Sequence, residues 1–117
     1  MKKRKLGKSG LEVSEIGLGC WQLGGDFGAV DDHRAAQTLA EADLNGINFW
    51  DTADVYGGGL SEQRIAGFRD VVETDVIVAT KVGRDGALSP DKYTKEAVRA
   101  NLQGSLGRLK VESLDLA

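Results

Sequence analysis

Apolar runs with the character of buried strands alternate along this chain with segments of helical periodicity. The apolar runs start near Ile16, Ile47, Val76 and Leu114. Strands that alternate with helices are joined by βαβ crossovers and form a parallel sheet. The pattern therefore predicts an α/β fold, which closes either as an open doubly wound sheet or as a (β/α)8 barrel.

Three helices are expected between these strands, and each begins at a residue type that caps helix N-termini. The first begins at Asp31 or Asp32 and ends before Gly46, the second begins at Ser61, and the third begins at Thr94. About four parallel strands should therefore alternate with three helices.

Residues 3–14 predict a β-hairpin ahead of the first of these strands, because two short strand-forming runs flank the turn at Gly7–Gly10. A length of 117 residues corresponds to one ordinary domain. We therefore expect one domain over residues 1–117, with the hairpin over 3–14 and βα units from about residue 16.

The turn after the first strand argues against a dinucleotide-binding doubly wound sheet. This turn, Gly17–Gln22, lacks the third glycine of the dinucleotide fingerprint. It also carries Trp21 where a phosphate group would have to approach the backbone. The barrel is the better interpretation.

Charged residues end two of the apolar runs, where the strands of a barrel hold its chemistry. Asp51 ends the second run and Lys81 ends the third. Side chains alternate along a strand, so Phe49 should face the barrel interior with Asp51, and Trp50 should face the helices. By the same rule Ile77 and Ala79 should share the face of Lys81, whereas Val76, Val78 and Thr80 should face the helices.

Composition excludes several classes of function. The net charge of −3 disfavours a polyanionic partner such as nucleic acid. No apolar run approaches the roughly 20 residues that span a membrane. The single cysteine, Cys20, cannot form an internal disulfide and fits a reducing compartment. We therefore expect a cytoplasmic protein that binds neither nucleic acid nor membrane.

Several segments along nearly the whole chain resemble the aldo-keto reductase superfamily. The most specific is Asp51–Gly57, with the pattern Asp-Thr-Ala-x-x-Tyr-Gly, which is followed by Ser-Glu at Ser61 and Glu62. The other matching segments are Leu6–Ser14, Ile16–Gly19, Gly46–Trp50, Ala79–Lys81 and Ser105–Leu109. The resemblance implies a (β/α)8 barrel, of which this chain would be the amino-terminal half.

The resemblance also implies a reaction and three of its catalytic residues. Members of this family interconvert carbonyls and alcohols by hydride transfer from NADP(H), with a tetrad of Asp, Tyr, Lys and His. Asp51, Tyr56 and Lys81 match the first three. Tyr56 would be the general acid that protonates the carbonyl oxygen. Lys81 would favour the ionised phenol, and Asp51 would hold Lys81 charged and in place.

Cofactor contacts follow from the same resemblance. The turn of Gly19, Cys20 and Trp21 would lie beside the nicotinamide ribose, and Asp51 would also touch this region. Trp21 would in addition line the pocket for a small carbonyl or alcohol substrate. These residues are therefore the expected binding site for the nicotinamide end of NADP(H).

The match departs from the family pattern at the fourth catalytic residue. Asp115–Ala117 begins a stretch that resembles Asp-Leu-Tyr-x-x-His, but the sequence ends before that histidine. The only histidine, His33, falls in the first turn of the first helix and is expected to be a solvated surface residue. Most family contacts to the cofactor phosphates come from the second half of the barrel. We therefore expect this chain to be inactive by itself.

Two other interpretations remain open at this stage. The chain could be a non-catalytic half-barrel, either a gene remnant or an assembly module, whose open edges would favour self-association. Auxiliary subunits of potassium channels also resemble this family, although nothing in the sequence selects that role. No metal is expected, because Asp51 and Asp54 lack a second histidine or an acidic cluster to complete a site.

Overall fold

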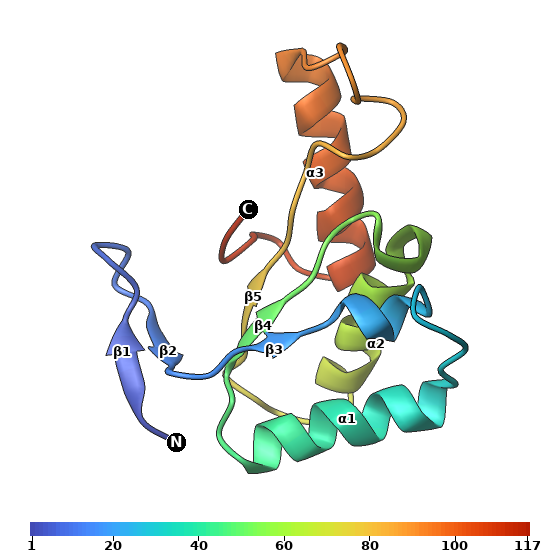
Figure 1. The fold of residues 1–117 in the computed structure, drawn as a ribbon. Helices are drawn as coiled ribbons and strands as arrows, with labels where there is room; N and C mark the ends of the chain where they lie inside the picture. The colour runs from blue at the N-terminus through green and yellow to red at the C-terminus, as the bar shows by residue number, and fades with distance from the viewer.

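The computed structural model describes all residues 1–117 (Figure 1). The chain begins with a β-hairpin that lies apart from the helices. Its strands, β1 (Lys3–Lys5) and β2 (Glu12–Ser14), pair antiparallel, with Lys3 opposite Ser14. Asn48 fastens this hairpin to the rest of the chain, since its Oδ1 accepts from the Ser14 amide at 2.7 Å. The hairpin expected over residues 3–14 is confirmed.

A parallel sheet follows, built from β3 (Leu18–Gly19), β4 (Phe49–Asp51) and β5 (Ile77–Ala79) in the order β3-β4-β5. Gly19 pairs with Asp51, and Asp51 pairs with Ala79. The three expected strands are therefore present, although each is shorter than its apolar run.

The fourth expected strand is reduced to one parallel bridge between Ala79 and Leu116. Beside it, the Thr80 amide donates to the Leu116 carbonyl at 3.1 Å. The Val78 amide donates instead to the side chain of Asp115, at 2.9 Å. Because a carboxylate takes the amide that a longer ladder would use, the backbone pairing does not extend further back along this segment.

Three helices cover the sheet: α1 (Asp32–Leu44), α2 (Leu60–Arg69) and α3 (Lys95–Leu109). The caps of the first and third are as expected, because Asp31 Oδ1 accepts from the Arg34 amide and Thr94 Oγ1 accepts from the Ala97 amide. The cap expected at Ser61 is wrong.

Helix α2 starts one residue earlier than expected, at Leu60. Gly59 occupies its N-cap with φ of 99°. This glycine ends η2 (Tyr56–Gly59), a 3-10 turn that follows β4. Ser61 is thereby placed inside the helix and fully buried, where its hydroxyl donates to the Cys20 carbonyl at 2.8 Å. A glycine with positive φ has displaced the serine from the capping role.

The hydrophobic core lies between the sheet and the helices. Trp50, Val76 and Val78 point into it, as the alternation of side chains predicts. They pack with helix residues that include Leu39, Ile65 and Leu109. The Trp50 ring lies 5.7 Å from that of Phe68 in α2. The assignment of these strand residues to the helix-covered face is confirmed.

The other face of the sheet has no helix over it, and Figure 1 shows all three helices on one side. Phe49 and Ile77 on this face are only partly buried. A doubly wound sheet carries helices on both faces, whereas a barrel carries them only outside. The arrangement is therefore that of an incomplete (β/α)8 barrel with an N-terminal hairpin. None of its helices combines the length and apolar character needed to cross a membrane.

Candidate active site

Asp51, Tyr56 and Lys81 come together where β4 and β5 end. The Lys81 ammonium donates to Asp51 Oδ1 and, at 2.9 Å, to the Thr52 carbonyl. Its Nζ also lies 5.2 Å from the centroid of the Tyr56 ring. The side chains of Asp51 and Lys81 are each 47% exposed. A carboxylate, an ammonium and a phenol thus share one solvent-accessible cluster, hereafter the Asp51–Tyr56–Lys81 cluster.

The surroundings of Lys81 act on its pKa in opposite directions. Partial burial lowers the pKa, whereas the hydrogen bond to Asp51 and the neighbouring phenol of Tyr56 raise it. The net result is a pKa above the usual 10.5. Lys81 is therefore an ammonium at neutral pH, with a fixed positive charge beside the phenol.

A close approach of two backbone segments holds Tyr56 in place. Tyr56 opens η2, and Gly57 follows it with φ of 59°. The neighbouring segment is η1 (Trp21–Gly24), the 3-10 turn after β3. A Cβ on Gly57 would lie 2.1 Å from the Gly24 carbonyl oxygen, and a Cβ on Gly24 would lie 2.5 Å from the Gly57 amide nitrogen. Only glycine at both positions allows the two turns to touch.

Trp21 packs directly on the phenol. Its ring lies parallel to that of Tyr56, with centroids 5.6 Å apart and an angle of 17° between planes. Asp26 Oδ2 accepts from the Trp21 indole at 2.9 Å and from the Gly57 amide at 3.0 Å. Asp26 was missed by sequence reasoning, because the Gly57 that it bonds is 31 residues away and no pattern signals that contact.

Buried polar contacts behind the cluster join the strand ends to α2. The fully buried hydroxyls of Thr52 and Ser61 lie 2.9 Å apart. Ser61 in turn donates to the carbonyl of Cys20. The turns after β3 and β4 are thereby tied to one helix, which fixes the relative positions of Cys20 and Asp51.

Glu62 is the second buried polar residue of α2, with an exposed fraction of 0%. Thr80 Oγ1 donates to its Oε1 at 2.5 Å, and Arg108 Nε donates to its Oε2 at 2.6 Å. Glu62 therefore connects Thr80, which lies between β5 and Lys81, to helix α3. The sequence shows Glu62 only as part of a matching motif and gives no sign of this partner in α3.

The four residues expected to hold the cofactor occupy different environments. Gly19 and Trp21 are exposed, and Asp51 is half-exposed. The side chain of Cys20 is fully buried, and burial raises the pKa of its thiol to about 12. Its backbone is also occupied within this chain, since its amide donates to the Asp51 carbonyl and its carbonyl accepts from the Ser61 hydroxyl. Cys20 therefore supports the turn from behind, and its thiol is not reactive.

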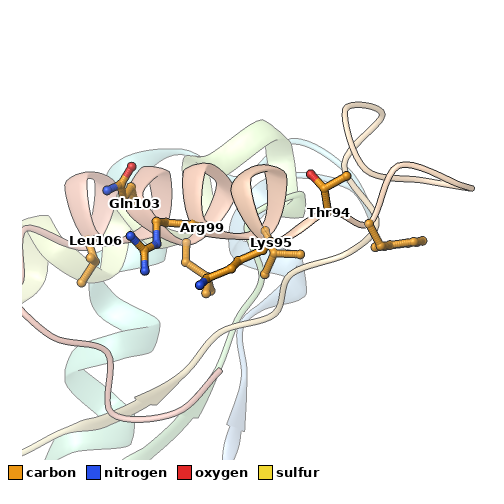
Figure 2. A pocket seen from close by; sticks show the side chains of 8 residues that line it. Thr94, Lys95, Arg99, Gln103 and Leu106 are labelled. Atoms are coloured by element: carbon orange, nitrogen blue, oxygen red, sulfur yellow. The ribbon is translucent and has the colours of Figure 1, made fainter.

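One cavity lies beside the Asp51–Tyr56–Lys81 cluster, and a separate groove lies on helix α3. A small cavity of about 40 Å³ is lined by residues that include Tyr56, Lys81 and Asp54. Asp54 Oδ2 is buried without a hydrogen-bond partner, and burial raises the pKa of this carboxyl. A larger groove runs along α3 and contains none of the expected site residues; Figure 2 shows Thr94, Arg99 and Leu106 along it.

The remaining candidate residue does not join the cluster. His33 lies in the first turn of α1 and is exposed, as expected for a surface histidine. No three His, Cys, Asp or Glu side chains are arranged so that they could hold a metal ion. The phenol, ammonium and carboxylate of the cluster can transfer protons and form hydrogen bonds with a ligand.

Comparison with known proteins gives the family. The sequence pattern of the Aldo/keto reductase family matches residues 15–117. L-galactose dehydrogenase of Arabidopsis thaliana is 42% identical over 118 residues, which cover 97% of this chain and 36% of that protein.

Two solved structures are similar in fold as well as in sequence. The aldo-keto reductase AKR11C1 of Bacillus halodurans, in its holo form, is 36% identical with a TM-score of 0.83 and covers 97% of this chain and 38% of its own. An aldo-keto reductase of Klebsiella pneumoniae in complex with NADPH is 26% identical with a TM-score of 0.76, covering 98% of this chain and 38% of its own. This chain spans less than half the length of each of these relatives. It belongs to the aldo/keto reductase family.

Proposed function

We propose that these residues form the proton-transfer part of an NADP(H)-dependent oxidoreductase site that reduces aldehydes or ketones to alcohols. The supporting observation is the juxtaposition of the Asp51–Tyr56–Lys81 cluster. Tyr56 is the general acid in this proposal, and its O–H protonates the carbonyl oxygen of a small substrate. Lys81 stabilises the phenolate that remains, and Asp51 orients Lys81 through their hydrogen bond.

The residues beside the cluster fit a nicotinamide cofactor, which supplies hydride when it is bound. Gly19 has no positive φ, and a Cβ on it would meet nothing within 4 Å. Neither backbone conformation nor packing within this chain therefore requires glycine there, and the open space suits a ligand. The adjoining Asp51 carboxylate can accept hydrogen bonds from hydroxyl groups. We propose that Gly19, Trp21 and Asp51 hold the nicotinamide end, and that the buried Cys20 contributes by fixing the turn between Gly19 and Trp21.

Turnover requires groups beyond those of the cluster. The one histidine, His33, is an exposed residue of α1 and does not belong to the cluster. The contacts described above include no site for the cofactor phosphates. We propose that residues 1–117 alone do not oxidise NADPH, and that further polypeptide supplies a histidine and the phosphate site. The single buried cysteine fits a cytoplasmic location.

A chimera tests this function. Residues 1–117 replace the matching segment of the Bacillus halodurans reductase, whose fold superimposes with a TM-score of 0.83. We expect the chimera to oxidise NADPH in the presence of 4-nitrobenzaldehyde, and the isolated chain to show no such activity. A folded chimera that binds NADPH and yet has no activity with any aldehyde would contradict the proposal.

A second candidate is a non-catalytic half-barrel that assembles with another copy of itself. The outer edge of β3 has no neighbouring strand, and the groove on α3 is lined by Val98, Leu102 and Leu106, which are half-buried. In this assembly, the β3 edge of one copy would pair with the Leu116 segment of the other copy, and the second copy would cover the groove on α3. Sedimentation velocity decides: a dimer that Leu102→Asp dissociates supports assembly, and a monomer at all concentrations excludes it.

A further inference from the structure

Asp26 joins two turns that also meet at Gly24 and Gly57 and through the rings of Trp21 and Tyr56. A single oxygen, Oδ2, accepts from both the Trp21 indole nitrogen, at 2.9 Å, and the Gly57 amide, at 3.0 Å. One donor belongs to a side chain in η1 and the other to the backbone of η2. The carboxylate therefore fixes the indole relative to the residue that follows Tyr56.

The ring contacts around Trp21 show what this fixation achieves. One ring neighbour is Tyr56, nearly parallel at 5.6 Å, and the other is Phe27, which meets the indole edge-on at 4.6 Å with an angle of 67°. Trp21 is nevertheless 44% exposed and Phe27 is 70% exposed. The three rings form an aromatic surface that faces solvent beside the phenol, hereafter the aromatic wall.

The backbone alone does not determine the position of the indole. The Gly24–Gly57 contact locks the turn that carries Tyr56. An exposed tryptophan side chain in a short 3-10 turn still has rotamers that point away into water. The two hydrogen bonds to Asp26 connect the indole ring to Gly57, which belongs to the locked turn, and so hold the ring in place. Without that link, only the contact between the rings would hold the parallel stack.

We propose that Asp26 is a positioning residue, which holds Trp21 against Tyr56 so that the aromatic wall is formed before substrate arrives. This inference rests on the proposed function, in which Tyr56 protonates a carbonyl. It deepens that function by naming a substrate class. A planar, aromatic carbonyl compound gains contact with the aromatic wall, whereas a small aliphatic aldehyde does not.

The test uses the 117-residue chain labelled with 5-fluorotryptophan and observed by ¹⁹F NMR. The chain has two tryptophans, so Trp21→Phe assigns both signals. Trp50, fully buried in the core, reports whether each variant is folded. Asp26→Ala should move the Trp21 signal toward its position in urea while the Trp50 signal stays. Asp26→Asn, which keeps an acceptor oxygen, should leave the Trp21 signal near its original position.

Ligand response completes the test without any need for turnover. Millimolar 4-nitrobenzaldehyde should shift the Trp21 signal, propanal should not, and Asp26→Ala should remove the shift. The exposed residue Glu112, changed to Ala, serves as the matched control and should alter nothing. An Asp26→Ala variant with an unchanged Trp21 signal, or equal shifts with the two aldehydes, overturns the inference. An inactive chimera with these NMR results intact would refute the proposed function alone.

Discussion

The Lys81 ammonium donates a hydrogen bond to the Asp51 carboxylate across the ends of β5 and β4. These residues are half-exposed, so their mutual attraction is screened by water and contributes little to overall stability. Its importance is local. Together with the bond to the Thr52 carbonyl, it holds Nζ 5.2 Å from the centre of the Tyr56 ring.

Removing the carboxylate should change the titration of Lys81. The pKa of Lys81 is above 10.5 because the hydrogen bond to Asp51 and the neighbouring Tyr56 outweigh partial burial. Asp51→Asn should therefore lower this pKa, as measured from the Lys81 ε-carbon shift by NMR. Asp70→Asn, which removes the partner of Lys110, is the matched control and should not affect Lys81.

The raised pKa of Lys81 also predicts how its contribution to stability depends on pH. A lysine with a raised folded-state pKa stabilises the fold below pH 10.5, and this contribution disappears as pH rises through the folded value. The difference in unfolding free energy between the wild type and Asp51→Asn should therefore shrink in strongly alkaline solution. A difference that grows with alkaline pH would contradict the assignment.

Gly57 and Gly58 should respond very differently to alanine. Both have positive φ, of 59° and 62°. A Cβ on Gly57 would lie 2.1 Å from the Gly24 carbonyl oxygen, whereas a Cβ on Gly58 meets nothing within 4 Å. Gly58→Ala should cost about 1 kcal/mol for its backbone conformation alone. Gly57→Ala should cost well over this in urea unfolding, or prevent folding; equal costs would show that the contact is not tight.

Arg108 neutralises the buried carboxylate of Glu62 and should be sensitive to loss of charge. Arg108→Met leaves Glu62 without its positive partner in a fully buried position. We expect a loss of roughly 3 kcal/mol in unfolding free energy. Arg99→Met, an exposed change on the same helix, should cost less than about 0.5 kcal/mol. Similar losses from the two variants would argue against a structural role for the Glu62–Arg108 pair.

Asp54 should make the fold less stable as pH rises. Burial, with a contribution from Glu62, raises the pKa of this carboxyl above its usual 3.8. The folded state therefore holds a proton that the unfolded state releases, so unfolding free energy falls as pH rises through the raised pKa. Asp54→Asn removes this penalty. Urea unfolding should show the variant gaining on the wild type from about pH 4 upward; a constant difference would contradict the shift.

The order of elements was predictable because it depends on local patterns. The capping residues Asp31 and Thr94 give the helix starts, and alternation along β4 and β5 identifies Trp50 and Val78 as core residues. The cap at Ser61 was mispredicted because a serine followed by a helical pattern looks the same whether its hydroxyl caps the helix or bonds a distant carbonyl. The difference lies in Gly59, whose positive φ becomes visible only in three dimensions.

The Asp51–Tyr56–Lys81 cluster was found through a motif, and its roles stay a prediction. What supports the cluster could not be found this way. Asp26 bonds Gly57 and Glu62 bonds Arg108 across separations of 31 and 46 residues. Pairing at such distances depends on which helices and turns become neighbours, and a single sequence carries no record of that.

The most direct test of the account is the rate of NADPH oxidation with 4-nitrobenzaldehyde by the chimera that carries residues 1–117, compared between Tyr56→Phe and Tyr93→Phe. Tyr93 is the only other tyrosine of this chain; its hydroxyl donates to the Gly83 carbonyl, and it does not line the cavity beside Tyr56 and Lys81. If Tyr56 protonates the carbonyl, Tyr56→Phe should lower kcat by about 100-fold or more, and Tyr93→Phe should leave it nearly unchanged. Equal activity of the two variants would contradict the role given to the phenol.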